Sequence, residues 1–173
     1  MHPAALPHED LMAQVTVVRT RASGPGGQHR NKTETAIRLC HEPTGVRGAA
    51  SERRSQNENL KVAVRRLRIA LAIEHRTPLT DADFVAPGAF ELSAAWLARV
   101  RGGRISLNVD HDDFPPLLAE ALDALHLYAD DLPRTATALR ISASQIVKFL
   151  GKEPAALHAL NERRRARSQR PLR

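Results

Sequence analysis

Aromatic residues and cysteine are both scarce in this chain, and each shortage narrows the choice of function. Aromatic residues make up 3% of the 173 residues. They do not form the closely spaced ring pairs on which single-stranded bases stack, so binding by base stacking is disfavoured. Cys40 is the single cysteine, which excludes an internal disulfide and is typical of a reducing compartment. The apolar and polar alternation around Cys40 is typical of a buried small side chain.

Long apolar runs and targeting patterns are also missing. No stretch approaches the roughly 18–20 consecutive apolar residues of a membrane-spanning helix. The N-terminus lacks the charged and then apolar pattern of a signal peptide. The hydrophobic share of 42% is that of a folded protein. We therefore expect a cytoplasmic protein with no membrane partner.

The sequence contains no familiar catalytic or metal-binding motif. Its histidines do not form a His-x-x-x-His pair with a glutamate between them, and one cysteine cannot build a structural zinc site. A nucleophile elbow and a phosphate-binding loop are absent too. The acid/base triplet His111-Asp112-Asp113 is better interpreted as a helix N-terminus, where aspartates complement the helix dipole. The sequence predicts no metal, no cofactor and no self-contained catalytic site.

Positive charge, in contrast, is abundant. The formal net charge is +7 and the isoelectric point is near 10.6, which indicates an anionic partner, most simply nucleic acid. Arginine carries most of this charge, and its planar guanidinium suits phosphate oxygens. A GC-rich genome would explain the high ratio of arginine to lysine, but it would not explain the net charge. Lysine occurs only at positions 32, 61, 148 and 152.

A glycine-rich segment at residues 23–32 is the most informative part of the sequence. It reads Ser-Gly-Pro-Gly-Gly-Gln-His-Arg-Asn-Lys, which predicts a loop, because three glycines and a proline cannot sustain a helix or a strand interior. Gly26 and Gly27 allow the backbone to approach a surface closely. Gln28 is a poor nucleophile and a poor base, so it offers a backbone N–H and a side-chain amide. Such a tip suits insertion into a negatively charged site that another molecule supplies.

The residues on both sides of this loop predict a small α+β unit over residues 11–76. A strand leads from Leu11 to Thr20, and the alternation at residues 35–41 predicts its partner. After a turn, a weaker third strand is expected from residue 46 to about 51.

A long helix follows these strands. Ser55-Gln56-Asn57-Glu58 is a capping box, and apolar residues then recur at helical spacing up to a stop near Pro78. We expect an antiparallel sheet with this helix packed across it, preceded by a flexible N-terminus at residues 1–10.

The second half of the chain predicts a different organisation. Residues 77–92 have the composition of a linker, and residues 93–158 predict a small, mainly α-helical domain. In this domain Ser93 caps a short helix that Gly102-Gly103 ends, and a brief strand follows at residues 104–109. Two short helices within residues 134–152 resemble a helix-turn-helix, although Arg140 stands where a glycine is usual. Residues 159–173 predict an arginine-rich tail.

Three motifs in register give the first half a family resemblance. Gly-Pro-Gly-Gly-Gln-His-x-Asn-Lys is followed by a strand, by His41-Glu42-Pro43-Thr44-Gly45-Val46, and by Glu52-Arg53-Arg54-Ser55-Gln56-x-x-Asn59. Together they resemble the catalytic domain of class I peptide chain release factors, known by its Gly-Gly-Gln (GGQ) motif. The resemblance covers about residues 11–75. With both flanks present it is far more specific than the tripeptide alone.

The resemblance implies ribosome-dependent hydrolysis of the peptidyl-tRNA ester, without a cofactor. Gly26 and Gly27 would let Gln28 enter the peptidyl transferase centre of the large subunit. There its backbone N–H would stabilise the developing charge, and its side chain would help position water. The family's glutamine is often methylated, so Gln28 is a candidate target of a glutamine methyltransferase. Arg30 departs from the small apolar residue that usually follows the histidine.

RNA phosphate contacts are expected beside the loop, ahead of the long helix and in the tail. The residues assigned to them are Arg19, Arg21, His29, Arg30, Asn31, Lys32, Arg53, Arg54, Arg163, Arg164, Arg165, Arg167 and Arg170.

Only about 22 residues precede the loop, so we expect no stop-codon-reading domain ahead of it. The chain resembles in size the codon-independent rescue hydrolases, whose basic tail enters the empty mRNA channel of stalled ribosomes.

Three functions fit the sequence. The leading hypothesis is a monomeric, codon-independent peptidyl-tRNA hydrolase that acts on the ribosome in translation termination or ribosome rescue. The alternative is a non-catalytic RNA- or DNA-binding protein of the helix-turn-helix type with a vestigial GGQ loop. A third hypothesis keeps the hydrolysis but directs it to free large subunits, with residues 93–173 recognising the tRNA.

Overall fold

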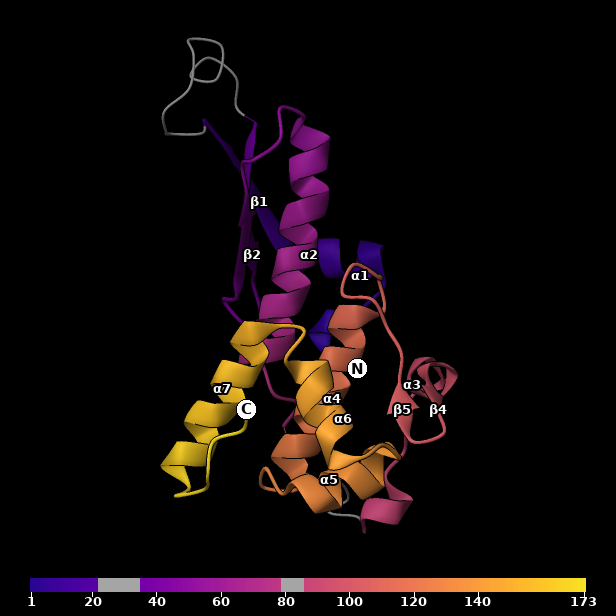
Figure 1. Ribbon diagram of the computed structural model, residues 1–173. Coiled ribbons are helices and arrows are strands. Elements are labelled where there is room, and N and C mark those ends of the chain that lie inside the picture. Colours follow the sequence, from indigo (N-terminus) through magenta and orange to yellow (C-terminus); the bar gives the residue numbers. More distant parts are fainter. Residues whose placement is uncertain (22–34, 79–85) are drawn as a thin grey trace. The chain divides into compact units, whose positions relative to one another are not determined.

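The computed structural model describes residues 1–21, 35–78 and 86–173. The chain divides into two compact units, Met1–His75 and Arg76–Arg173. Unit 1 contains a three-stranded antiparallel sheet, and unit 2 is mainly helical (Figure 1). The predicted α+β class is therefore confirmed.

The sheet of unit 1 has the strand order β1-β2-β3. Its strands are β1 (Val15–Thr20), β2 (Ala36–His41) and β3 (Arg47–Ala50). β1 runs antiparallel to β2 with Thr20 opposite Ala36 at one end and Val15 opposite His41 at the other. The long helix α2 (Gln56–Glu74) lies along one face of this sheet (Figure 1). Ser55 caps it by accepting a hydrogen bond from the Glu58 N–H, as the capping box predicted.

The core of unit 1 lies between the sheet and α2. Ile37 and Leu39 of β2 and Leu67 and Leu71 of α2 are all at most 1% exposed. Burial of such a side chain stabilises a fold by about 1.5–3 kcal/mol. Gly48 of β3 lies so close to the helix that a Cβ there would stand 2.7 Å from the Ala63 backbone oxygen.

The N-terminal segment at residues 1–10, for which the sequence predicted flexibility, packs against α2. It forms η1 (Pro3–Ala5) and most of α1 (His8–Met12). Ala4 is fully buried, and the Arg68 guanidinium donates a hydrogen bond of 2.8 Å to its carbonyl oxygen. The segment is held because Ala4 is buried and its carbonyl oxygen binds Arg68 of α2. The composition of residues 1–10 does not reveal such contacts with a distant helix.

Unit 2 is built from short elements around a central helix. They are η3 (Pro87–Ala89), α3 (Ala94–Arg99), β4 (Val100–Arg101), β5 (Arg104–Ile105), α4 (Phe114–Leu127), α5 (Leu132–Leu139), α6 (Ala143–Leu150) and α7 (Pro154–Ala166). In the ranges that the structure describes, no helix has the length and apolar character needed to span a membrane.

Aromatic rings occupy the centre of unit 2. The Trp96 and Phe149 rings meet edge to face at 5.8 Å, and Phe114 lies 5.5 Å from Phe149. The Trp96 indole N–H donates a hydrogen bond of 2.9 Å to the Leu139 carbonyl oxygen. The buried ring thereby keeps a polar partner, as a fully buried tryptophan requires.

Two details of unit 2 correct the sequence interpretation. Gly102 and Gly103 have φ values of +55° and +72° and form the turn between β4 and β5, so they do not end a helix. The expected strand at residues 104–109 is only Arg104–Ile105. Helix α3 has already ended at Arg99. A glycine pair suits both a helix end and a two-residue hairpin turn, and here the turn is realised.

The pair α5 and α6 is separated by residues 140–142. Arg140 adopts the left-handed conformation with φ +55°, the geometry that glycine supplies most easily. Ser142 caps α6 by accepting a hydrogen bond from the Gln145 N–H. These features occur where the sequence predicted a helix-turn-helix, whose role as a nucleic-acid reader remains a prediction.

Candidate functional site

The predicted catalytic residues Gly26, Gly27 and Gln28 lie outside the described residues. The same holds for His29, Arg30, Asn31 and Lys32. The described residues that border this segment, 20–21 before it and 35–36 after it, are called here the loop base. Their contacts show how the two ends of the segment are held.

The loop base is set by the pairing of β1 with β2. The chain leaves β1 at Thr20 and returns to β2 at Ala36, and these two residues lie opposite each other in the ladder. Residues 21–35 therefore start and finish at the same end of the sheet. The hairpin thus anchors both ends of the GGQ segment on one rigid element.

Asn59, in the first turns of α2, fastens the returning end. Its side-chain amide donates hydrogen bonds to the Thr35 carbonyl oxygen at 2.6 Å and to the Arg53 carbonyl oxygen at 2.9 Å. Its carbonyl oxygen accepts a hydrogen bond of 2.9 Å from the Arg53 N–H. The side chain is fully buried. One residue thus holds the last residue before β2 and the segment that precedes α2.

Asn59 was part of a predicted motif, but its role was not foreseen. The sequence interpretation used the motif for its resemblance and for the Ser55 cap. The sequence does indicate that Asn59 has a special role, because an asparagine inside a strongly helical pattern needs hydrogen-bond partners for its side-chain amide. What the sequence could not give was the identity of those partners, which are backbone groups six and 24 residues away.

Four of the predicted RNA-contacting arginines surround the loop base. Arg19 lies opposite Ile37 at the loop end of the ladder, and Arg21 follows β1 directly. Arg53 and Arg54 belong to the segment that Asn59 fastens. The structure thus brings all four to the end of the sheet from which the predicted catalytic segment starts. All four side chains are exposed.

An ion pair secures the segment ahead of α2. Glu52 accepts a hydrogen bond of 2.6 Å from Arg66, which also donates to the Ala49 carbonyl oxygen at 2.8 Å. The hydrogen bond from Arg66, with those from the backbone, lowers the pKa of the Glu52 carboxyl. Both side chains are about half exposed, so we expect the pair to position the segment more than to stabilise the fold.

His41 belongs to the opposite end of the sheet. It is fully buried and its Nδ1 lies 2.8 Å from the Thr44 hydroxyl, while Nε2 lies 3.2 Å from Gln14 Oε1. Burial, and then the nearby His75, lowers its pKa. Gly45, with φ +71°, completes the turn. The six residues of β2, about 17 Å of strand, separate this turn from the loop base.

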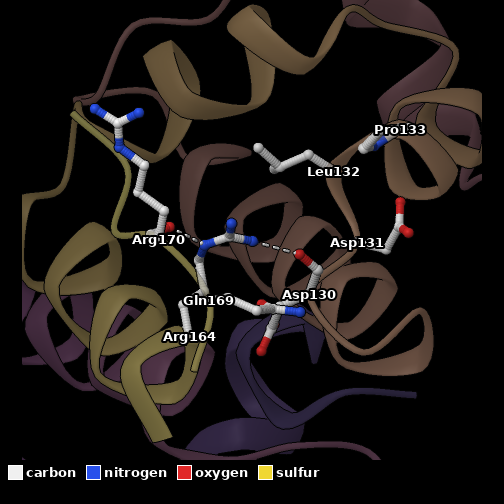
Figure 2. A pocket seen from close by; sticks show the side chains of 7 residues that line it. All are labelled: Asp130, Asp131, Leu132, Pro133, Arg164, Gln169 and Arg170. Carbon is white, nitrogen blue, oxygen red and sulfur yellow. Dashed lines mark hydrogen bonds between the residues drawn. The ribbon is translucent and has the colours of Figure 1, made fainter. Parts of the chain in front are cut away.

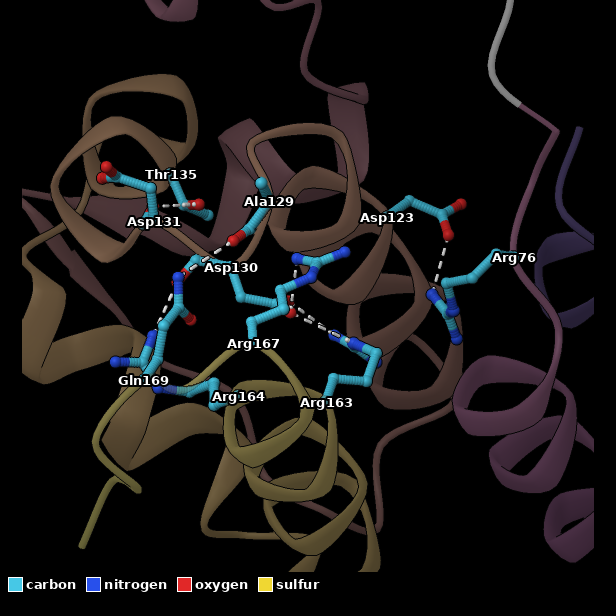
Figure 3. Close-up of polar contacts among 10 residues, drawn as sticks. All are labelled: Arg76, Asp123, Ala129, Asp130, Asp131, Thr135, Arg163, Arg164, Arg167 and Gln169. Carbon is cyan, nitrogen blue, oxygen red and sulfur yellow. Dashed lines mark hydrogen bonds and ion pairs between the residues drawn. The ribbon is translucent and has the colours of Figure 1, made fainter.

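The predicted tail arginines fall partly on α7, and several of them bind within unit 2. Asp130, between α4 and α5, is fully buried and accepts from Arg163 at 2.9 Å and from Arg167 at 2.8 Å (Figure 3). Arg164 donates to the Asp130 backbone oxygen at 2.7 Å. Arg165 pairs with Glu162 on the same helix. These contacts occupy guanidinium groups that the sequence assigned to RNA.

The C-terminal residues fold back along α7. The Asn161 amide both donates to and accepts from the backbone of Leu172, at 3.0 and 2.7 Å. Arg164 also donates to the Arg170 carbonyl oxygen at 2.9 Å. A pocket of about 350 Å³ lies beside this return, and Arg164 crosses it between the carbonyl oxygens of Asp130 and Arg170 (Figure 2). Its wall also carries Asp131 and Gln169.

The described ranges contain no candidate metal site, because no group of three or more histidine, cysteine, aspartate or glutamate side chains lies together there.

Comparison with known protein families gives a match for the part of the chain that contains the GGQ segment. Residues 7–82 match the RF-1 domain. The resemblance to class I release factors is thereby confirmed for unit 1. The RF-1 match starts at α1, includes the GGQ segment and the Asn59 contacts, and continues past the end of α2.

Three relatives of this chain are named as release factors. Peptide chain release factor 1 of Ureaplasma parvum serovar 3 is 43% identical over 74 residues, which is 39% of this chain and 21% of that protein. Peptide chain release factor 2 of Colwellia psychrerythraea is 37% identical over 90 residues, 51% of this chain and 24% of that protein. Peptide chain release factor 2 of Variovorax paradoxus is 51% identical over 59 residues, 34% and 16% respectively. The chain therefore spans a quarter or less of the length of these relatives.

Proposed function

We propose that this protein hydrolyses the ester bond of peptidyl-tRNA on the ribosome, without reading a codon, and that Gln28 of the RF-1 domain acts in the peptidyl transferase centre. The observation that carries the proposal is the RF-1 match over residues 7–82, which includes Gly26, Gly27 and Gln28. Two relatives similar to part of this chain are named peptide chain release factors 1 and 2.

The chemistry assigned to Gln28 is electrostatic. Its backbone N–H donates to the oxygen on which negative charge develops as water attacks the ester carbonyl, and its side-chain amide orients that water. Gly26 and Gly27 let the backbone approach a crowded RNA surface. Ribosomal RNA and the tRNA supply the remaining groups.

The loop base supports this role by limiting the freedom of the segment. A donor is effective only when it is held near the position of the developing charge before the reaction. The β1–β2 ladder fixes both ends of the segment, and the buried Asn59 adds two hydrogen bonds from α2 to the returning end and the segment beside it. Arg19, Arg21, Arg53 and Arg54 surround the same end and are proposed to contact RNA phosphates.

Peptide release from purified ribosomes tests the proposal. Intact ribosomes carrying labelled peptidyl-tRNA on a truncated mRNA, the same ribosomes with a stop codon in the A site, and free large subunits with peptidyl-tRNA are incubated with the protein. Codon-independent action predicts release from the truncated complex. Release restricted to the stop-codon complex would refute that part of the proposal, and release only from free subunits would favour the third hypothesis.

Two substitutions at position 28 distinguish the contribution of the backbone N–H from that of the side-chain amide. Gln28→Pro removes the backbone N–H, and we expect release to fall by about 10²–10³-fold while ribosome binding persists. Gln28→Ala keeps the N–H and loses the amide, so its defect is smaller. Asn57→Ala, which removes an exposed amide from α2, is the control and retains activity. Release by Gln28→Pro at the parent rate would overturn the assignment.

The α5–α6 pair favours one alternative, a non-catalytic nucleic-acid binder. A three-residue connection between two short helices suits that motif, and Lys148 of α6 is exposed. Retention on duplex DNA with no association with ribosomes would support this alternative and contradict the proposed hydrolysis.

A further inference from the structure

We propose that the face of the RF-1 sheet opposite α2 binds an RNA backbone, and that Arg38 and Arg47 are its phosphate-binding residues. This surface, called here the outer face, consists of Thr16, Val18, Arg38, Cys40, Arg47 and Ala49. The inference rests on the proposed function, because it assigns a further RNA contact to the same domain. Neither arginine belongs to the set that the sequence assigned to RNA.

The side on which these residues lie follows from their neighbours in the strands. Leu39 of β2 is 1% exposed and pairs with Gly48 of β3, whose Cβ position points at the backbone of α2. Successive side chains of a strand point to opposite faces. Arg38 and Arg47 therefore point away from α2.

The strand register brings the two arginines together. Arg38 lies opposite Ala49, two residues along β3 from Arg47. Such diagonal neighbours on one face are about 7–8 Å apart. Because one strand of a nucleic-acid helix carries a phosphate about every 3.4 Å along the axis, two arginines at this spacing can each reach a phosphate of the same strand.

The surroundings of these arginines are small and uncharged. Arg38 is flanked by Val18 in β1 and by Ala49 in β3. The next row joins Thr16 of β1, Cys40 and Arg47. The six residues of the outer face include no acidic side chain, and the nearest acidic residue along β2 is the exposed Glu42, in the turn that follows the strand.

Both guanidinium groups are available to a ligand. Arg38 and Arg47 are exposed, and neither guanidinium group makes a hydrogen bond or an ion pair with any residue that the structure describes. Two of the three arginines of α2 differ, because Arg66 binds Glu52 and Arg68 binds the Ala4 carbonyl oxygen. The free pair therefore lies on the one sheet face that the helix leaves uncovered.

The composition of the outer face favours an RNA backbone over other occupants. It offers no aromatic ring for base stacking, so recognition falls on phosphates and is independent of sequence. A second copy of the chain is disfavoured, since it would oppose arginine to arginine across a small surface whose main apolar side chain is Val18, 47% exposed. The loop base continues this face, because β1 and β2 run from it into the GGQ segment.

Binding and kinetics with large ribosomal subunits test the proposal. Arg38→Gln/Arg47→Gln is compared with Arg101→Gln/Arg104→Gln, which removes two exposed arginines that face each other in the β4–β5 hairpin. At about 0.1 M salt we expect the first variant to bind large subunits about tenfold more weakly, with a salt slope shallower by about 2. The KM for release should rise with kcat unchanged. The control should change each quantity less than twofold.

The outcomes separate this proposal from the proposed function. If both double variants weaken binding equally, the effect is one of net charge and the outer face is not a site. If the parent protein releases no peptide, the hydrolysis proposal fails, while subunit affinity still reports on the outer face. Subunits with and without peptidyl-tRNA distinguish contact with tRNA from contact with ribosomal RNA. A parent dimer that the first variant dissociates would show an interface between copies and overturn the RNA assignment. Circular dichroism verifies that each variant is folded.

Discussion

Two pairs of arginines, one in each unit of this chain, are used in opposite ways. In the RF-1 domain, Arg38 and Arg47 extend from an uncovered sheet face without a partner among the described residues. In unit 2, Arg163 and Arg167 converge on the buried carboxylate of Asp130. The residue type alone therefore does not identify an RNA contact. An arginine that already binds groups of its own fold has fewer donors left for RNA, whereas an exposed arginine such as Arg101 is not an RNA contact by exposure alone.

The cores of the two units differ as well. Residues 1–75 contain no phenylalanine, tyrosine or tryptophan, so aliphatic side chains build the core of unit 1. Unit 2 holds all the aromatic residues of the chain, including Trp96 and Phe149 at its centre. Fluorescence of Trp96 consequently reports on unit 2, and amide hydrogen exchange is needed for unit 1. The predictions below use this difference.

The largest change in stability is expected when the ion pairs of Asp130 with Arg163 and Arg167 are removed. Asp130→Asn keeps a residue that tolerates the φ of +61° but removes the charge that Arg163 and Arg167 share. We expect unit 2 to lose about 3 kcal/mol of its free energy of unfolding, because a buried ion pair loses one partner. Urea denaturation followed by Trp96 fluorescence measures the loss. The exposed Asp112→Asn is the control, and an equal loss there would contradict this account.

A smaller effect is expected at the loop base. Asn59→Ala leaves two carbonyl groups and one N–H of the backbone without their side-chain partner. We expect a loss of about 2 kcal/mol, because unsatisfied buried groups retain their desolvation cost. Hydrogen exchange of unit 1 amides measures this loss. Peptide release should fall by more than the loss of folded protein explains, since the returning end of the GGQ segment is no longer held. Unchanged release would show that Asn59 serves stability alone.

A gain in stability is expected at Arg140. Its left-handed conformation strains a side chain, so Arg140→Gly should stabilise unit 2 by about 0.5–1 kcal/mol. Lys148→Gly, at an exposed position inside α6, should instead destabilise it by about 1 kcal/mol. Denaturation with Trp96 fluorescence distinguishes the signs. A loss with both substitutions would mean that the Arg140 side chain makes a contact that outweighs the strain.

The smallest effect concerns pH and His41. Burial lowers the pKa of His41 from its usual value of 6.5, so the unfolded chain takes up the proton first as the pH falls. The stability of unit 1 is therefore complete above about pH 6.5, and it declines as the pH falls from there toward the lowered pKa. Amide exchange of unit 1 between pH 7 and 5 measures this slope, and His41→Gln should reduce it. An unchanged slope would assign the pH dependence to another group.

The sequence predicts the elements of unit 1 well because they are governed by local patterns. Strand alternation located β2, and Ser55 with helical spacing located α2. The first strand was expected from Leu11 but begins at Val15, because residues 11 and 12 belong to α1. The contacts that hold the loop base join residues up to 24 positions apart, which no local pattern encodes. Arg163 and Asp130 lie 33 positions apart, so the internal ion pairs of the expected tail were equally hidden.

The family of the candidate site was predictable from its motifs, whereas the catalytic role of Gln28 stays a prediction and the contacts that support the segment were not foreseen. Residue types indicated a loop at residues 23–32, the resemblance of three motifs in register gave the family, and the RF-1 match over residues 7–82 agrees with that family. Asp113 shows the limit of such reasoning. It occupies the expected N-cap position of α4, but its carboxylate binds Arg99 at 2.6 Å and makes no cap hydrogen bond. A nearby guanidinium competes with the helix N-terminus for the same oxygen atoms.

Gly48 determines the thickness of the RF-1 domain. Because there is no room for a Cβ between β3 and the backbone at Ala63 and Leu67, sheet and helix are separated there by main-chain atoms alone. A domain that narrow occupies less cross-section than one with two interdigitating layers of side chains. A bulkier residue at this position would push α2 outward and move Asn59 with it, so the spacing of sheet and helix at Gly48 and the contact of Asn59 with Thr35 depend on the same helix.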